Sequence, residues 1–373
     1  MAYNDSRIRS LRAKMAGAGL DALYVRGLSN VAWLTGFEGV FDGEAAHAVV
    51  LTAADCGLHT DSRYLAALEQ RASGTEIRID GSRRAHSAFL RDMVAGISPD
   101  SPGVALRVGI EDSLTLAEFR SLQKALAEAE VQLVELEGFV EGLRQVKDEA
   151  EIDAMRKAQA ITDAAFSCIV EAMHAGMTER EVQLMLDNFM LEEGAEGLAF
   201  STIVATGAHA ASPHAIPGDT KLQPGDAVVM DFGARFGGYC SDMTRTVFVG
   251  QPSEELQRAF SVLRRANEEC EAMVQAGVCA DSVHAHAEQV LAEGGFEGAM
   301  GHSLGHSVGI DIHESPNLSP RNGEPLAAGN VVTVEPGIYL PGKFGMRLED
   351  FGVVRSGGYE VLTQSTHEMV IVG

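Results

Sequence analysis

The chain has 373 residues, which is long for one hydrophobic core, so we expect two domains. Apolar residues make up 46% of the composition, enough to fill both cores. The formal net charge of −24 would repel phosphate backbones and anionic bilayers, so nucleic acid and membranes are not expected partners.

The first residues, MAYNDSRIRSLRAKM, lack the apolar core of a signal peptide, and no apolar run of about 18 residues follows. The five cysteines are scattered and form no CxxC pair, which favours reduced thiols over a disulfide framework or a zinc finger. We therefore expect a soluble, cytoplasmic protein.

Residues 7 to 138 alternate helical stretches with short apolar strands. RIRSLRAKMAGAGL and LTLAEFRSLQKALAEAE predict helices, whereas ALYV, AHAVVLT, RVGIE and VQLVEL predict strands. This alternation is typical of an α/β domain, and we place its boundary near residue 145, giving domains 1–145 and 146–373.

A charged segment, LRQVKDEAEIDAMRKAQAITDAAFSCIVEAM, then predicts a long helix that opens the second domain, with Lys147, Glu149, Glu151 and Arg156 on its polar side. A second helix is expected over 178–194, strands near Ile203 and Val228, and helices over 253–276 and 280–294. The last third is rich in strands, so an α+β domain is expected.

Residues 227–249, AVVMDFGARFGGYCSDMTRTVFV, predict a β-hairpin. With its turn centred between Phe236 and Gly237, Asp231 faces Asp242 across the two strands. Like charges so placed are destabilising unless a cation lies between them.

Residues 331–354, VVTVEPGIYLPGKFGMRLEDFGVV, predict a second hairpin with its centre near Gly342. This register places Glu335 opposite Glu349. The repeated pattern suggests a duplicated half-domain in which each half contributes one carboxylate pair. The alternative is that these acids are solvated edge residues or partners of Arg245 and Arg347.

The stretch GHSVGIDIHE carries His306 and His313 among glycines and β-branched residues, which favours an extended segment. Fully extended, it would separate the histidines by roughly 23 Å, so they share a site only if the chain bends, for example at Gly309. Four carboxylates and one imidazole suit two divalent cations, with Mn²⁺ favoured and Co²⁺ or Zn²⁺ also accommodated. Such a dinuclear site is suited to hydrolysis.

The motifs MDFG…GYCSDMTRT, GHSVGIDIHESP, VEPGIY and RLED resemble, in order and spacing, the pita-bread metallopeptidases of the aminopeptidase P and prolidase group. FSTIVATGAHAASPH is similar to the upstream substrate-histidine segment of this family, and NVAWLTGF and TDSRY resemble its creatinase-type N-terminal domain. The resemblance implies an α/β N-terminal domain followed by an α+β pita-bread catalytic domain with pseudo-two-fold duplicated halves.

The resemblance also implies roles for individual residues. Glu335 would act as the catalytic acid–base besides binding metal, and His313 and His214 would face the reacting peptide. His302 would lie near the substrate pocket, and Arg347 would pair with a ligand carboxylate or contact substrate. The role of His209, where relatives often have asparagine, stays open. The implied metal ligands are Asp231, Asp242, His306, Glu335 and Glu349.

The function implied is hydrolysis of Xaa-Pro bonds in proline-containing peptides by a homodimer with two divalent ions per chain. Some prolidases have an arginine where this chain has Asn317, and a neutral amide cannot neutralise the carboxylate of a dipeptide. We therefore expect aminopeptidase P-like activity, with Xaa-Pro dipeptidase activity as the alternative. A metal-free binding module and a creatinase-like hydrolase are more remote alternatives.

Overall fold

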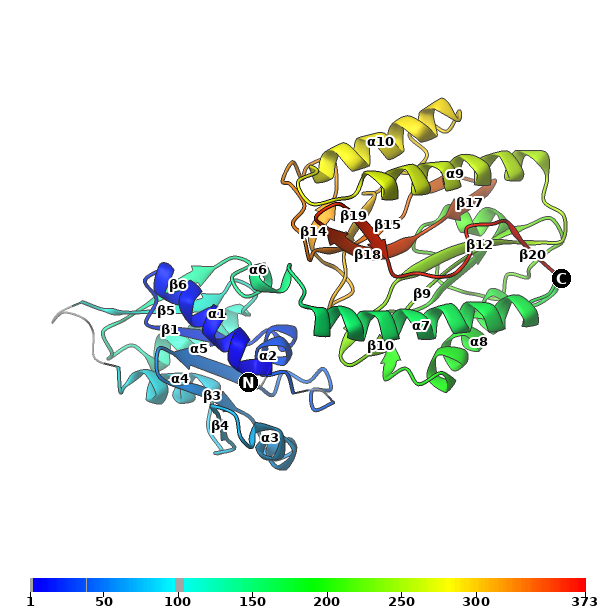
Figure 1. Cartoon of the computed structure of the whole chain (residues 1–373). Helices are drawn as coiled ribbons and strands as arrows, with labels where there is room; N and C mark the ends of the chain where they lie inside the picture. The colour runs from blue at the N-terminus through cyan, green and yellow to red at the C-terminus, as the bar shows by residue number, and fades with distance from the viewer. Residues whose placement is uncertain (1–2, 38, 98–103) are drawn as a thin grey trace. The chain divides into compact units, whose positions relative to one another are not determined.

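The computed structural model describes residues 3–37, 39–97 and 104–373, and the chain divides into two compact units, Met1–Arg144 and Gln145–Gly373 (Figure 1). No helix in these described ranges is both long and apolar enough to cross a bilayer.

The first unit is a six-stranded mixed sheet with the strand order β4-β3-β2-β1-β5-β6. Alternate residues of its central strands, including Tyr24, Val50 and Ile110, pack against Phe89 and Leu122 of two helices. Its helices are α1 (Tyr3–Gly17), α2 (Leu28–Thr35), α3 (Leu65–Ala72), α4 (His86–Val94), α5 (Leu116–Ala125) and α6 (Glu141–Arg144). Its strands are β1 (Ala22–Val25), β2 (Ala48–Thr52), β3 (Cys56–His59), β4 (Ile77–Asp80), β5 (Leu106–Glu111) and β6 (Val131–Leu136).

The second unit contains four long helices and two main sheets, with strand orders β20-β12-β9-β8 and β14-β13-β15-β18-β19. Its helices are α7 (Glu149–Ala172), α8 (Glu179–Glu192), α9 (Glu254–Met273), α10 (Ala280–Glu293) and the 3₁₀ turn η1 (Gly207–Ala211). Its strands are β7 (Gly197–Leu198), β8 (Ile203–Thr206), β9 (Ala227–Phe232), β10 (Ala234–Phe236), β11 (Tyr239–Cys240), β12 (Met243–Val249), β13 (Gly305–Ser307), β14 (Glu314–Leu318), β15 (Val331–Val334), β16 (Gly337–Leu340), β17 (Phe344–Arg347), β18 (Asp350–Arg355), β19 (Gly358–Val361) and β20 (Val370–Val372).

Within this unit, α7 and α8 cover one side of the strands, and α9 and α10 cover the other (Figure 1). One core cluster joins α7 and α8 to β9 and β12, and another joins α9 and α10 to β15 and β17. Each half therefore consists of two helices and a hairpin, which agrees with the expected duplication.

Equivalent turns precede the first strand of each hairpin. Asp226 Oδ2 accepts a hydrogen bond from Gln223 N (2.9 Å), and Asn330 Oδ1 accepts one from Ala327 N (2.7 Å). Asp231 follows the first turn, and Glu335 follows the second, at the same spacing. The two acids thus occupy equivalent positions in the two halves.

The expected register of the second hairpin is confirmed. Val334 pairs with Asp350, and Gly337 pairs with Arg347, so the same register places Glu335 opposite Glu349. The expected register of the first hairpin is wrong, because Asp231 pairs with Thr244 rather than with Asp242. Asp242 lies two residues before Thr244, so the two aspartates are diagonal neighbours on one face of the hairpin.

The error in register comes from the turn. Phe236 pairs with Tyr239, so the turn residues are Gly237 and Gly238, one position later than predicted. Both glycines have positive φ, 58° and 76°, which is the conformation that a two-residue hairpin turn of type I′ requires. The Gly-Gly pair itself was the available sequence signal.

Lys147 also departs from the sequence prediction. The long helix begins after Asp148, whose side chain accepts from Ala150 N and Glu151 N in a capping box. Lys147 therefore precedes α7, and it is buried rather than placed on the polar side of the helix. Glu151, expected on the same polar side, is buried as well and accepts a hydrogen bond from the Tyr239 hydroxyl.

The turn predicts a difference between two substitutions at Gly238, where an added Cβ would meet open space. Gly238→Val should lower the free energy of unfolding by about 1–2 kcal/mol relative to Gly238→Asn, because asparagine tolerates positive φ and valine does not. Urea denaturation of both variants measures the difference. Equal stabilities would contradict the assigned turn.

Candidate metal centre

The five expected ligands come from both halves of the second unit. Asp231 lies in β9, Asp242 immediately before β12, His306 in β13, Glu335 immediately after β15 and Glu349 immediately before β18. The two main sheets meet at this point through a bridge between Thr244 and Glu349. The fold thus brings residues more than a hundred positions apart to one buried place.

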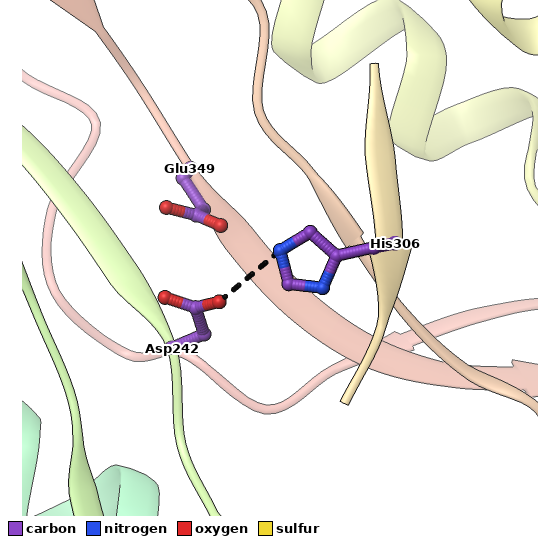
Figure 2. Close-up of side chains that lie close together, drawn as sticks. All are labelled: Asp242, His306 and Glu349. Atoms are coloured by element: carbon purple, nitrogen blue, oxygen red, sulfur yellow. Dashed lines mark ion pairs between the residues drawn. The ribbon is translucent and has the colours of Figure 1, made fainter. Parts of the chain in front are cut away.

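Three of these side chains form a compact cluster. Figure 2 shows Asp242, His306 and Glu349 pointing toward one another, and one ligand atom from each lies within 4.8 Å of the others. His306 Nε2 is 3.5 Å from Asp242 Oδ2 and 3.4 Å from Glu335 Oε1. Atoms that share one ion at about 2.1 Å lie roughly 3 Å apart, so these separations fit a common ion after small adjustments.

Burial and mutual repulsion oppose ionisation of the carboxylates at this site. Burial, together with neighbouring Asp231 and Glu335, raises the pKa of Asp242 well above its usual range. Burial and the adjacent carboxylates likewise raise the pKa of Glu349. For Glu335, burial is again the largest effect and raises the pKa. A divalent cation would offset both the repulsion and the loss of hydration.

Asp231 is the expected ligand that pairs with Arg347. Its Oδ2 forms an ion pair with Arg347, whereas its Oδ1 is buried and accepts no hydrogen bond from any described residue. A buried carboxylate oxygen normally has a partner. The donor set, with its oxygen-rich chemistry and one imidazole, therefore fits a hard or borderline divalent ion.

Arg347 connects the two hairpins on the protein side of the cluster. In addition to Asp231, its guanidinium donates to Thr244 Oγ1 (2.8 Å) and to Tyr339 Oη (2.8 Å). The nearest oxygen of Glu335 is 4.0 Å from Arg347 Nε. Arg347 therefore pairs with the carboxylate of an expected ligand, and its other hydrogen bonds go to protein groups of the same site.

Sequence reasoning missed three residues of the site. The Thr244 hydroxyl donates to Glu349 Oε2 (2.6 Å), and the Thr333 hydroxyl donates to Glu335 Oε1 (3.1 Å). Tyr339 lies within hydrogen-bonding distance of His302 Nε2 (3.3 Å) as well as of Arg347. Each threonine lies two residues from an expected ligand in a strand, and period-two alternation was the signal that could have identified it.

The seven-residue separation of His306 and His313 does not keep them apart. Their ring centroids lie 4.4 Å from each other, because β13 and β14 pair as a hairpin and residues 308–313 form its loop. The bend that includes Gly309 thus brings both rings to one site. Burial, followed by the charges of His306 and His214, lowers the pKa of His313.

The remaining histidines differ in their surroundings. His302 is partly buried, its Nδ1 lies 2.8 Å from Ser303 O, and burial lowers its pKa. His214 is exposed on the segment that follows η1. His209 instead pairs with the buried Glu179, at 2.7 Å, a residue outside the expected ligand set.

Comparison with known proteins places both units. The pattern of "Metallopeptidase family M24" matches residues 153–356, and that of "Creatinase/Prolidase N-terminal domain" matches residues 7–146. An uncharacterized peptidase of Bacillus subtilis, YqhT, is 35% identical over 98% of this chain and 100% of its own length.

Two solved structures are similar along nearly the whole chain. An Xaa-Pro dipeptidase from Bacillus anthracis has a TM-score of 0.90 and 33% identity, covering 99% of this chain and 100% of its own. An X-Pro aminopeptidase from Thermotoga maritima has a TM-score of 0.86 and 33% identity, covering 96% and 100%. These similarities confirm the expected pita-bread architecture and N-terminal domain, and the chain belongs to metallopeptidase family M24.

Proposed function

We propose that this protein is a metal-dependent peptidase that hydrolyses the bond before proline in Xaa-Pro peptides. The observation that carries the proposal is the buried cluster of Asp242, His306 and Glu349, in which burial and neighbouring carboxylates raise the pKa of both acids although Arg347 lies nearby. We assign two divalent ions per chain, with Mn²⁺ favoured, to Asp231, Asp242, His306, Glu335 and Glu349.

Bound divalent ions supply Lewis acidity and an activated water for attack on a peptide carbonyl. The residues of the chain then orient the substrate and move protons. Glu335, whose Oε1 accepts from Thr333, is held in one orientation and is the group proposed to exchange a proton with the reacting water and amine. His313 and His214 are proposed to donate hydrogen bonds to the substrate as negative charge develops on its carbonyl oxygen.

Arg347 and His302 are proposed to border the substrate. The Arg347 guanidinium pairs with Asp231 and donates to Tyr339, so it holds both side chains in place. It also offsets part of the negative charge of the site. His302 shares Tyr339 as a neighbour, with ring centroids 5.5 Å apart, which supports a place beside the same pocket. The specificity for proline is carried by similarity, since both solved relatives are named for Xaa-Pro or X-Pro substrates.

Acceptance of peptides longer than dipeptides is the favoured form of this activity. Asn317 is exposed in β14 and pairs with His306 across the hairpin, so a neutral amide occupies the strand position next to an expected ligand. Two cations of the second unit that could bind a dipeptide carboxylate in place of an arginine at this position have other partners. Arg235 donates to the carbonyls of Gly238 (3.0 Å) and Ile310 (2.9 Å), and Lys343 pairs with Glu255.

One observation favours the dipeptidase alternative. Arg321, in the segment after β14, lines the same cleft as Asn317, with a volume of about 450 Å³. A guanidinium there could bind the free carboxylate of a dipeptide. We also propose a cytoplasmic homodimer; the five free cysteines support a reducing compartment.

The metal assignment predicts that the purified protein binds two divalent ions per chain and loses peptidase activity in chelator. Asp242→Ala should lose activity and bound metal, because it removes a carboxylate at the centre of the cluster. Elemental analysis and hydrolysis of an Xaa-Pro peptide measure both effects. The exposed Asp55→Ala serves as the control. Full activity in Asp242→Ala, or a metal-free active protein, would support a creatinase-like hydrolase instead. A protein with neither bound metal nor peptidase activity would support a binding module.

Substitutions of the two histidines of the β13–β14 hairpin are predicted to have different effects on metal binding and turnover. His306→Ala should reduce metal occupancy, whereas His313→Ala should keep the metal and lower kcat by roughly 100- to 1000-fold. Metal content and steady-state kinetics of the two variants, matched in position and chemistry, give the comparison. Equal loss of metal in both would place His313 among the ligands.

The substrate-length assignment predicts a higher kcat/KM for an Xaa-Pro-Yaa tripeptide than for the matching Xaa-Pro dipeptide. Asn317→Arg should shift the ratio toward the dipeptide, because it supplies a bidentate cation. Arg321→Ala tests the alternative and should leave the ratio unchanged. A hundredfold preference for the dipeptide, about 2.7 kcal/mol of transition-state binding, would contradict this assignment.

A further inference from the structure

Lys147 lies at the start of the catalytic unit and is bonded to the hairpin that carries both site histidines. Its side chain is 1% exposed, and Nζ lies 2.9 Å from Ser307 Oγ and 3.1 Å from Glu314 Oε2. Ser307 and Glu314 face each other in the pairing of β13 with β14. The ammonium group therefore links the two residues that flank the loop formed by residues 308–313.

The loop itself folds over the carboxylate of Glu314. Glu314 Oε1 accepts a hydrogen bond from Asp311 N (3.1 Å). Gly309 approaches so closely that an added Cβ would lie 2.4 Å from the same oxygen. One carboxylate thus contacts Lys147 at the base of the loop and the main chain at its tip.

This arrangement bears directly on the histidines. His306 immediately precedes Ser307, and His313 immediately precedes Glu314. The link through Lys147 therefore fixes the separation of the two histidine rings. The strand pairing alone does not fix this separation, because the register of β13 with β14 shifts at a bulge between His306 and Ser307. The buried charge pair resists opening, since separating it would leave an uncompensated charge.

We propose that Lys147 and Glu314 are positioning residues that hold His313 against His306 in the geometry needed for turnover. The proposal rests on the proposed function in one respect, the role of His313 toward substrate. Lys147 and Glu314 act through the loop and touch neither substrate nor metal. They are distinguished from purely structural residues by an effect on kcat that persists when stability is retained.

The test is the double variant Lys147→Met with Glu314→Gln, which removes both charges with little change in volume. Replacing a buried ion pair by neutral groups is often close to neutral for stability, so this variant should fold with wild-type resistance to urea and wild-type metal content. Because the loop is no longer held, kcat for an Xaa-Pro peptide should fall at least about tenfold, with KM within about twofold.

The matched control is Lys343→Met with Glu255→Gln, which removes an exposed ion pair of the same 3.1 Å separation and should retain wild-type kcat. A second readout does not depend on activity. In zinc-loaded, histidine-labelled protein, the NOE between the rings of His306 and His313 should be present in the wild type and lost in the Lys147/Glu314 double variant.

A folded double variant with wild-type kcat and an intact NOE overturns the proposal. If that variant does not fold, Glu314→Asp provides the test, because it keeps the charge but moves it away from Lys147 and from the loop. We expect about a tenfold loss of kcat in this variant, and full activity would contradict the proposal. If the wild type cleaves no Xaa-Pro peptide, the proposed function fails while the NOE still tests the positioning.

Discussion

The mutual repulsion of buried carboxylates is the constraint on which the catalytic unit depends. Asp242, Glu335 and Glu349 all have raised pKa values because they are removed from water and lie near other carboxylates, Asp231 among them. Such a cluster survives folding only if rigid elements on every side hold it and cations offset its charge. The two sheets, the helices behind them and Arg347 provide the first condition, and the chemistry of family M24 provides the second.

Duplication explains how one chain assembles this cluster. The equivalent turns at Asp226 and Asn330 place Asp231 and Glu335 at matching points of the two halves. The ion pair of Arg347 with Asp231 and the hydrogen bond of Thr244 with Glu349 then run from one half to the other. Neither half has a complete site, so the interface between halves and the centre of the site are the same place.

Much of this site could be predicted from sequence, and the failures have physical causes. The register of the second hairpin was correct because its loop is symmetric about Gly342. The first was wrong because the turn was placed on Phe236 and Gly237 rather than on Gly237 and Gly238, the pair that adopts positive φ. The pairing of Arg347 with a ligand carboxylate was expected from the family resemblance. The partner of Thr244 was not predictable, since Glu349 lies across the junction of two sheets. In the first unit, β1 and β6 matched their predicted bounds, but β3 and β4 were missed. β3 (CGLH) has no apolar alternation, and β4 (IRID) alternates over only four residues.

The parallel pairing of β20 with β12 has a consequence for biosynthesis. Val249 of β12 pairs with Val372 of β20, about 120 residues later in the chain. At about 5–20 residues per second, a ribosome needs roughly 6 to 24 s to make that stretch. During this time β12 is an edge strand with unpaired backbone groups, adjacent to the acids of the first hairpin. The nascent chain thus passes through a period in which its catalytic sheet is open to wrong pairing, and chaperone protection at that stage would benefit its yield.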